Sequence, residues 1–290
     1  MTLALQVARH DDAPPAVFPS PSRSAGTSAS PAPTAPPTPG RTPGASSTTQ
    51  SSNPSGVPAG VTLREHRGDL VVSTPGTVVE KVHVVGSIIV QAPNVRIRHT
   101  RVSPPAGAYW VIRQAPGAID LTVEHSELAG GDKVHIGLSQ EAAGLTVSRS
   151  VFTGVDTGVS VGSRASVADS VFTRVDAGVG TSGGVSQVAI RRNTVTTRAT
   201  SVEAAVGLYT EKGPLTAVVV EDNLLAGGNY TFHVGEGRGT QEITAQRNRI
   251  ARTVHPNGGH FGPVAGWDSR AAGNRWADNV WDDTGAQIRV

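Results

Sequence analysis

The stretches VSRSVFTGVDTGVSVG at 147–162 and VADSVFTRVDAGVGTS at 167–182 decide the fold. They align with an offset of 20 residues, which matches Phe152 with Phe172 and Val159 with Val179. Similarity at a fixed period is the sequence signature of a repeat architecture. The runs are short, β-branched and bounded by Gly, and they lack helical periodicity. The two stretches therefore predict stacked β-repeats.

The same pattern recurs along the chain, and in each copy a small polar residue follows an apolar strand. The aligned residues are Thr100, Ser126, Ser150, Ser170, Asn193, Asn223, Asn248 and Asn274. Alternate residues of a strand face the same side, so copies stacked in parallel bring like residues together. We expect this polar column to be buried and to hydrogen-bond between copies. The pattern predicts an all-β, single-stranded right-handed parallel β-helix, a solenoid of roughly 9–11 coils.

Composition divides the 290 residues into two parts. Residues 1–55 are rich in Pro, Ser, Thr and Ala, which predicts a disordered tail or linker because such a tract cannot bury enough surface to offset its chain entropy. Residues 56–290 carry the repeats. A solenoid needs covered ends, and the Trp-rich segment at about 268–290, with Trp276 and Trp281, is the expected C-terminal cap.

Charge and cysteine content narrow the function classes. The formal charge of +2 does not provide the concentrated basic face that nucleic acid needs, so we expect no nucleic-acid partner. The chain has no cysteine, which excludes disulfides, thiol nucleophiles and Cys-ligated metals. The sequence contains no run of about 20 apolar residues, so we expect no transmembrane segment. The apolar start Met1 to Val7 meets ARHDD at once, so no signal peptide is visible in the sequence, although an upstream start codon could supply one.

Four segments also carry a family resemblance: GVPAGVTL, NVRIRHTRV, EDNLLAGGNYTFHV and GHFGPVAGWDSRAAGNRWADNVWDD. Together they resemble the actinobacterial right-handed parallel β-helix repeat proteins of the pectate-lyase-like superfamily, over roughly residues 56–290. The resemblance implies an extracellular or cell-envelope location and a carbohydrate-related role. Members commonly carry His-Asn-Asp-Gly before one face, where this chain has Val175-Asp176-Ala177-Gly178.

The strand that follows the polar column offers a candidate binding face. With Val159, its counterpart Val179, Val206 and Phe232 facing inward, strict alternation turns their neighbours outward, including Gly180, Gly207 and Thr231. Small residues would form the floor and larger ones the walls of a groove for a polysaccharide or cell-wall glycan. A plain solvated strand face would carry the same scattered polar residues. The candidate substrate-binding residues are Lys133, His135, Ser160, Ser182, Tyr209, His233 and His260.

Three aspartates, Asp132, Asp156 and Asp176, align at the corner that enters this face. Carboxylates stacked about 5 Å apart repel each other unless a cation or hydrogen bonds compensate, which makes them candidates for a Ca²⁺ site. Asp-x-Gly is also an ordinary turn sequence in which the carboxylate accepts nearby backbone N–H groups. We favour the turn, and no cofactor is required.

Catalysis would need a recognisable set of residues. A polysaccharide lyase needs an Arg or Lys base beside Ca²⁺-binding acids, and a glycoside hydrolase needs two carboxylates flanking the scissile bond. Neither set is complete, and the best cluster comprises Glu211, Lys212, Glu236 and Arg238, which ordinary solvated turns would equally contain. The basic run Arg96, Arg98, His99 and Arg101 is a second, weaker surface feature.

These observations favour an exported or surface-associated protein that binds, and in one reading processes, a polysaccharide. A lyase or glycoside hydrolase is the enzymatic alternative, and a structural or adhesive spike is the third reading. The sequence does not determine the oligomeric state.

Overall fold

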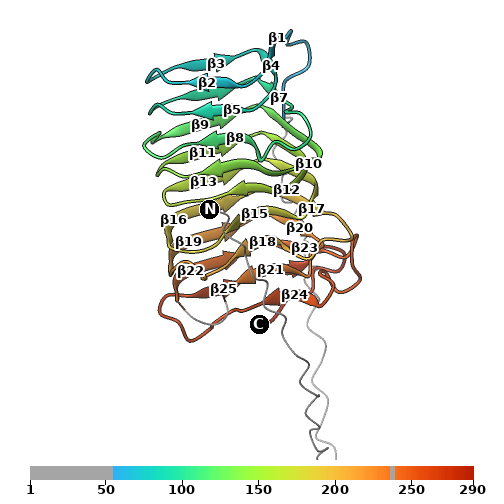
Figure 1. Cartoon of the computed structure of the whole chain (residues 1–290). Coiled ribbons are helices and arrows are strands. Elements are labelled where there is room, and N and C mark those ends of the chain that lie inside the picture. Colours follow the sequence, from blue (N-terminus) through green and yellow to red (C-terminus); the bar gives the residue numbers. More distant parts are fainter. Residues whose placement is uncertain (1–54, 236–238) are drawn as a thin grey trace, which may run out of the picture. The chain divides into compact units, whose positions relative to one another are not determined.

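The computed structural model describes residues 55–235 and 239–290, so the predicted disorder of residues 1–55 falls almost entirely outside the described residues. All regular elements in the described part are β-strands, as the absence of helical periodicity predicts. All pairings between named strands are parallel. The strands stack in chain order from β1–β5 at one end to β24–β26 at the other (Figure 1).

In each copy, the strand just before the polar column belongs to a sheet of nine strands. Each strand pairs with its counterpart in the next copy. The strands are β3 (Val78–Glu80), β6 (Arg96–Arg98), β9 (Leu121–Glu124), β11 (Leu145–Ser148), β13 (Ala165–Ala168), β16 (Val185–Arg191), β19 (Leu215–Glu221), β22 (Thr240–Gln246) and β25 (Arg275–Ala277).

The second sheet has 17 strands and contains two series of pairings that merge in two long strands, β10 (Glu127–Gln140) and β12 (Val151–Ser160). The series directly after the polar column also contains β1 (Arg64–Arg67), β4 (Val82–Val85), β7 (Arg101–Val102), β14 (Val171–Val175), β17 (Thr194–Thr197), β20 (Leu224–Ala226), β23 (Arg249–Ala251) and β26 (Val280–Trp281). The following series contains β2 (Leu70–Val72), β5 (Ile88–Val90), β8 (Trp110–Gln114), β15 (Ala177–Thr181), β18 (Ala204–Leu208), β21 (Tyr230–Val234) and β24 (Gly262–Ala265).

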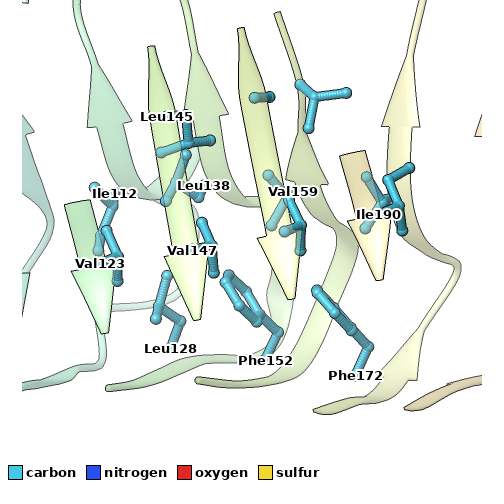
Figure 2. Packing of buried hydrophobic residues seen from close by; sticks show 14 of the residues in the cluster. Ile112, Val123, Leu128, Leu138, Leu145, Val147, Phe152, Val159, Phe172 and Ile190 are labelled. Carbon is cyan, nitrogen blue, oxygen red and sulfur yellow. The ribbon is translucent and has the colours of Figure 1, made fainter. Parts of the chain in front are cut away.

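These three series of parallel pairings are compatible with a parallel β-helix. The register is the one that the twin stretches predict: Phe152 pairs with Phe172 and Val159 with Val179. The two phenylalanine rings stack with centroids 4.7 Å apart, and both side chains are fully buried. Figure 2 shows them in the apolar core between the strands. Stacking of like residues therefore builds one continuous core.

The polar column lies inside this core. The backbone N–H of each member donates to the side-chain oxygen of the member in the next copy, as from Ser150 to Ser170 (3.1 Å) and from Asn193 to Asn223 (2.9 Å). Each member follows a residue with positive φ, such as Arg149 (47°) or Arg192 (52°). The positive φ turns the chain at this point, so the N–H of the column residue does not bond to a neighbouring strand. The side-chain oxygen of the next copy accepts its hydrogen bond instead.

One member of the column was predicted wrongly. Asn248 donates from its backbone N–H to Asn279 Oδ1 (3.0 Å), so Asn279, which is fully buried, continues the column in place of Asn274. Asn274 instead accepts a hydrogen bond from the backbone N–H of Ile243 (3.0 Å) in the nine-stranded sheet.

The Trp-rich C-terminal segment lies against the last copies. Trp276 donates from Nε1 to the backbone oxygen of Ile288 (2.7 Å), and its ring lies 5.7 Å from that of Phe232. Trp281 lies in β26, where the guanidinium carbon of Arg252 sits 3.9 Å from its ring centroid. The segment thus packs on core side chains.

Candidate functional site

One outward column, which ends in His233 and is otherwise made of small residues, runs along the series of strands from β12 through β15 and β18 to β21. Strand pairing aligns Ser160 with Gly180, Gly180 with Gly207, and Gly207 with His233. A Cβ on Gly180 would meet nothing closer than 3.5 Å. An added side chain at Gly180 would therefore begin without a steric clash.

Alternation breaks beside this column. A Cβ on Gly158 would lie 2.4 Å from a ring carbon of Phe172, and the neighbouring Val159 is fully buried, so two consecutive residues face inward. Both flanking residues, Thr157 and Ser160, then reach the outer surface. The expectation that Thr231 faces outward is wrong for this reason, because Thr231 occupies the inward position next to Phe232 and is fully buried.

The outer surface is hollowed over this column, with a cavity of about 690 Å³. Its lining combines a floor of small side chains with aromatic and acidic ones. The lining residues are Thr157, Ser160, Ala177, Gly180, Thr181, Ser182, Val202, Glu203, Ala204, Tyr209, Glu211, Asn229, Tyr230, His233 and Phe261. We call this cavity the groove.

Aromatic side chains form one wall of the groove. The Tyr209 ring lies over Gly207, where an added Cβ would come within 2.8 Å of it, and meets the His233 ring edge-on at 4.9 Å. Tyr230 lies between His233, at 6.1 Å, and Phe261, at 5.9 Å. Phe261 is 63% exposed, although exposure of a large aromatic side chain is unfavourable. The wall is thus a contiguous, accessible aromatic surface.

A tyrosine–glutamate pair sits at the edge of this wall. The Tyr209 hydroxyl donates to Glu203 Oε2 (3.0 Å). Burial, followed by the charge and hydrogen bond of Glu203 and the charge of Glu211, raises the pKa of Tyr209 well above its usual value. The phenol therefore stays protonated and acts as a donor rather than as a nucleophile.

Of the seven candidate substrate-binding residues, four line the groove: Ser160, Ser182, Tyr209 and His233. His260 lies beside it, with its ring 4.6 Å from that of Phe261. Lys133 and His135 are in β10 outside the groove, and His135 Nδ1 contacts Asp156 Oδ2 (2.8 Å). Whether any of them binds a sugar stays a prediction.

Sequence reasoning missed Glu203, Tyr230 and Phe261, which also line the groove. Strict alternation would turn Tyr230 inward, because it precedes the inward Phe232 by two residues in β21, so the break in alternation is what brings it to the groove. Glu203 and Phe261 lie outside the strands, so no alternation pattern identifies them.

The three aligned aspartates share one cation, the guanidinium of Arg198. Its nitrogens lie 3.2 Å from Asp132, 3.6 Å from Asp156 and 2.9 Å from Asp176. Arg174 also pairs with Asp132. Asp156 lies within β12, so the turn interpretation is wrong for it.

Within residues 55–235 and 239–290, no group of three or more His, Asp or Glu side chains could hold a metal ion. Arg198 already supplies charge that compensates the three stacked carboxylates.

The predicted catalytic cluster is only partly described. Glu211 lines the groove, whereas Lys212 is exposed in the adjacent turn, where its backbone N–H donates to Ser182 O (2.8 Å). Glu236 and Arg238 lie outside the described residues. The described members therefore bring one carboxylate, Glu211, to the groove.

The basic run at 96–101 is neutralised by neighbouring carboxylates. Arg98 pairs with Glu80 (3.0 Å) and Arg101 with Glu127 (2.6 Å). This pairing leaves little free positive charge for an acidic partner.

Comparisons with protein-family models, with curated proteins and with solved structures yield no match for this chain. Among the described residues, no helix is long and apolar enough to cross a membrane.

Proposed function

We propose that residues 56–290 form a right-handed parallel β-helix of the pectate-lyase-like type and that the groove binds a polysaccharide. Three series of parallel pairings and a continuous polar column support the fold. The sequence resemblance supports the superfamily. The Pro/Ser/Thr/Ala-rich residues 1–55 and the same resemblance support an extracellular or cell-envelope location.

The observation that carries the binding proposal is the Tyr209 ring over Gly207 at the edge of an open floor. Sugar rings present C–H faces that pack on aromatic rings, while their hydroxyls exchange hydrogen bonds with polar side chains. The groove offers both, with Tyr209 and Tyr230 on the wall and Ser160 and Ser182 on the floor. Because the floor follows consecutive copies, an extended chain can lie along the stacking direction.

The test is binding of cell-wall and plant polysaccharides to the purified chain and to two variants at one position. Tyr209→Ala removes the ring, and we expect a loss of affinity of about tenfold or more, as for aromatic residues at the centre of an interface. Tyr209→Phe keeps the ring and loses only the hydrogen bond to Glu203, so it should bind within about threefold of the parent. A Tyr209→Ala variant that binds as well as the parent would remove the groove assignment.

A glycoside hydrolase is the second candidate, because Glu203 and Glu211 both line the groove and both raise the pKa of Tyr209. Two carboxylates on one sugar site are the groups that glycoside hydrolysis requires. This reading predicts new reducing ends on a bound glycan, which disappear in both Glu203→Gln and Glu211→Gln. Binding without product across a broad panel would leave a binding protein.

A further inference from the structure

Among the described residues that line the groove, the acidic side chains are Glu203 and Glu211, and no Lys or Arg side chain accompanies them. Both are exposed at the rim, where a bound chain would meet them. Burial, and after it the negative charges of Glu203 and Glu211, raise the pKa of Tyr209, in keeping with a negative potential at the aromatic wall.

The nearby guanidinium of Arg198 does not offset this charge, because it is held by carboxylates outside the groove. It contacts Asp132, Asp156 and Asp176, and its own side chain is 21% exposed. His233 is constrained as well, since its Nε2 lies 2.9 Å from the carbonyl oxygen of Gly235 and must donate to it. The charged groups left for a ligand are therefore the carboxylates, beside neutral hydroxyls and the Asn229 amide.

We infer that the groove selects glycans that carry protonated amino groups, such as chains of de-N-acetylated amino sugars, over chains of uronic acids. This inference rests on the proposed polysaccharide binding. An ammonium group gains charge-assisted hydrogen bonds from Glu203 and Glu211, whereas a uronate carboxylate beside them is repelled. Neutral sugars gain only the aromatic and hydroxyl contacts.

The test uses three oligosaccharides of equal length: a neutral N-acetylglucosamine chain, its de-N-acetylated form and an oligogalacturonate. Calorimetry runs at low salt, at a pH where the amines are protonated. We expect the de-N-acetylated chain to bind about tenfold more tightly than the neutral chain and the uronate to bind more weakly than both. Raising the salt concentration should narrow these differences.

Two variants separate groove recognition from general attraction. Glu203→Gln/Glu211→Gln should remove the preference for the amine, so that the de-N-acetylated and neutral chains bind this variant with similar affinity. Glu242→Gln changes an exposed carboxylate on the nine-stranded sheet and should preserve the preference.

Uronate binding as tight as that of the aminated chain would overturn the inference and leave polysaccharide binding standing. A preference for the amine that persists in the double variant would do the same. Failure of all three chains, and of the wider polysaccharide panel, would overturn the proposed function itself.

Discussion

The inner polar column and the outer column of the groove come from the same repeat but obey opposite rules. Inside, Asn223 accepts a hydrogen bond from the backbone N–H of Asn193 and donates from Nδ2 to Asn248 Oδ1 and to the backbone oxygen of Ile190. Outside, a Cβ on Gly180 would meet only ordinary contacts, the nearest at 3.5 Å. The hydrogen bonds of the column therefore dictate the inner residues, while no steric contact requires a glycine at position 180. Small residues that recur outside need a different explanation, which the groove supplies.

The largest effect that we expect is on the inner column. Asn223→Ala leaves the backbone N–H of Asn193, the carbonyl of Ile190 and Oδ1 of Asn248 without this partner. A buried unsatisfied group costs roughly 1–3 kcal/mol, so the free energy of unfolding should fall by about 3–5 kcal/mol. Denaturant titration measures it.

The matched outer change is Ser160→Ala, which should alter the free energy of unfolding by less than about 0.5 kcal/mol. Equal losses for Asn223→Ala and Ser160→Ala would break the contrast between the two columns.

Two glycines of the repeat, Gly158 and Gly180, extend the comparison, with an expected change in unfolding free energy about half that of Asn223→Ala. Both have backbone angles outside the left-handed region, so conformation does not separate them. Gly158→Ala drives a Cβ to 2.4 Å from Phe172 and 2.5 Å from the Gly178 oxygen and should cost about 1–3 kcal/mol. Gly180→Ala meets no such contact and should be neutral or stabilise by about 0.4–1 kcal/mol through the unfolded state. Thermal unfolding of the pair measures the difference, and a Gly180→Ala variant less stable than Gly158→Ala would contradict it.

The smallest effect concerns His125, whose φ of 47° forms the corner before Ser126 of the inner column. Burial, followed by the positive charges of Arg149 and His99, lowers its pKa below the ordinary 6.5. The unfolded chain then binds a proton that the folded chain refuses, so stability should fall as pH drops below 6.5 towards the folded pKa.

His125→Asn removes this titration and suits the left-handed corner. Urea unfolding from about pH 8 to about pH 5 should show a shallower decline for the variant than for the parent. Parallel declines would show that His125 does not contribute.

How far the sequence predicts this molecule depends on whether a position repeats. Phe152 and Phe172 aligned correctly because like residues stack in register. The pattern of a small polar residue after an apolar strand selects Asn274, which instead precedes β25. Asn279 follows Trp276 and Ala277 just as Asn248 follows Ala245 and Gln246 in the paired strand, so strand register identifies the true member.

The groove was less predictable for two physical reasons. The prediction assumed strict alternation, but Gly158 and Val159 both face inward. The same break in a later copy places Thr231 inward beside Phe232. The wall residue Phe261 and the rim residue Glu203 lie in loops, whose positions depend on tertiary contacts rather than on the strand period.

The most direct test of the central claim is glycan binding by Gly180→Phe. A phenylalanine at this position would occupy part of the groove, and its Cβ would clash with no neighbour, the nearest atom being 3.5 Å away. We predict that calorimetry with the polysaccharide that the parent binds will detect no binding, while the unfolding temperature stays at the parent value. A Gly180→Phe variant that is equally stable and binds this polysaccharide with the parent's affinity would contradict the claim that the groove is the binding site.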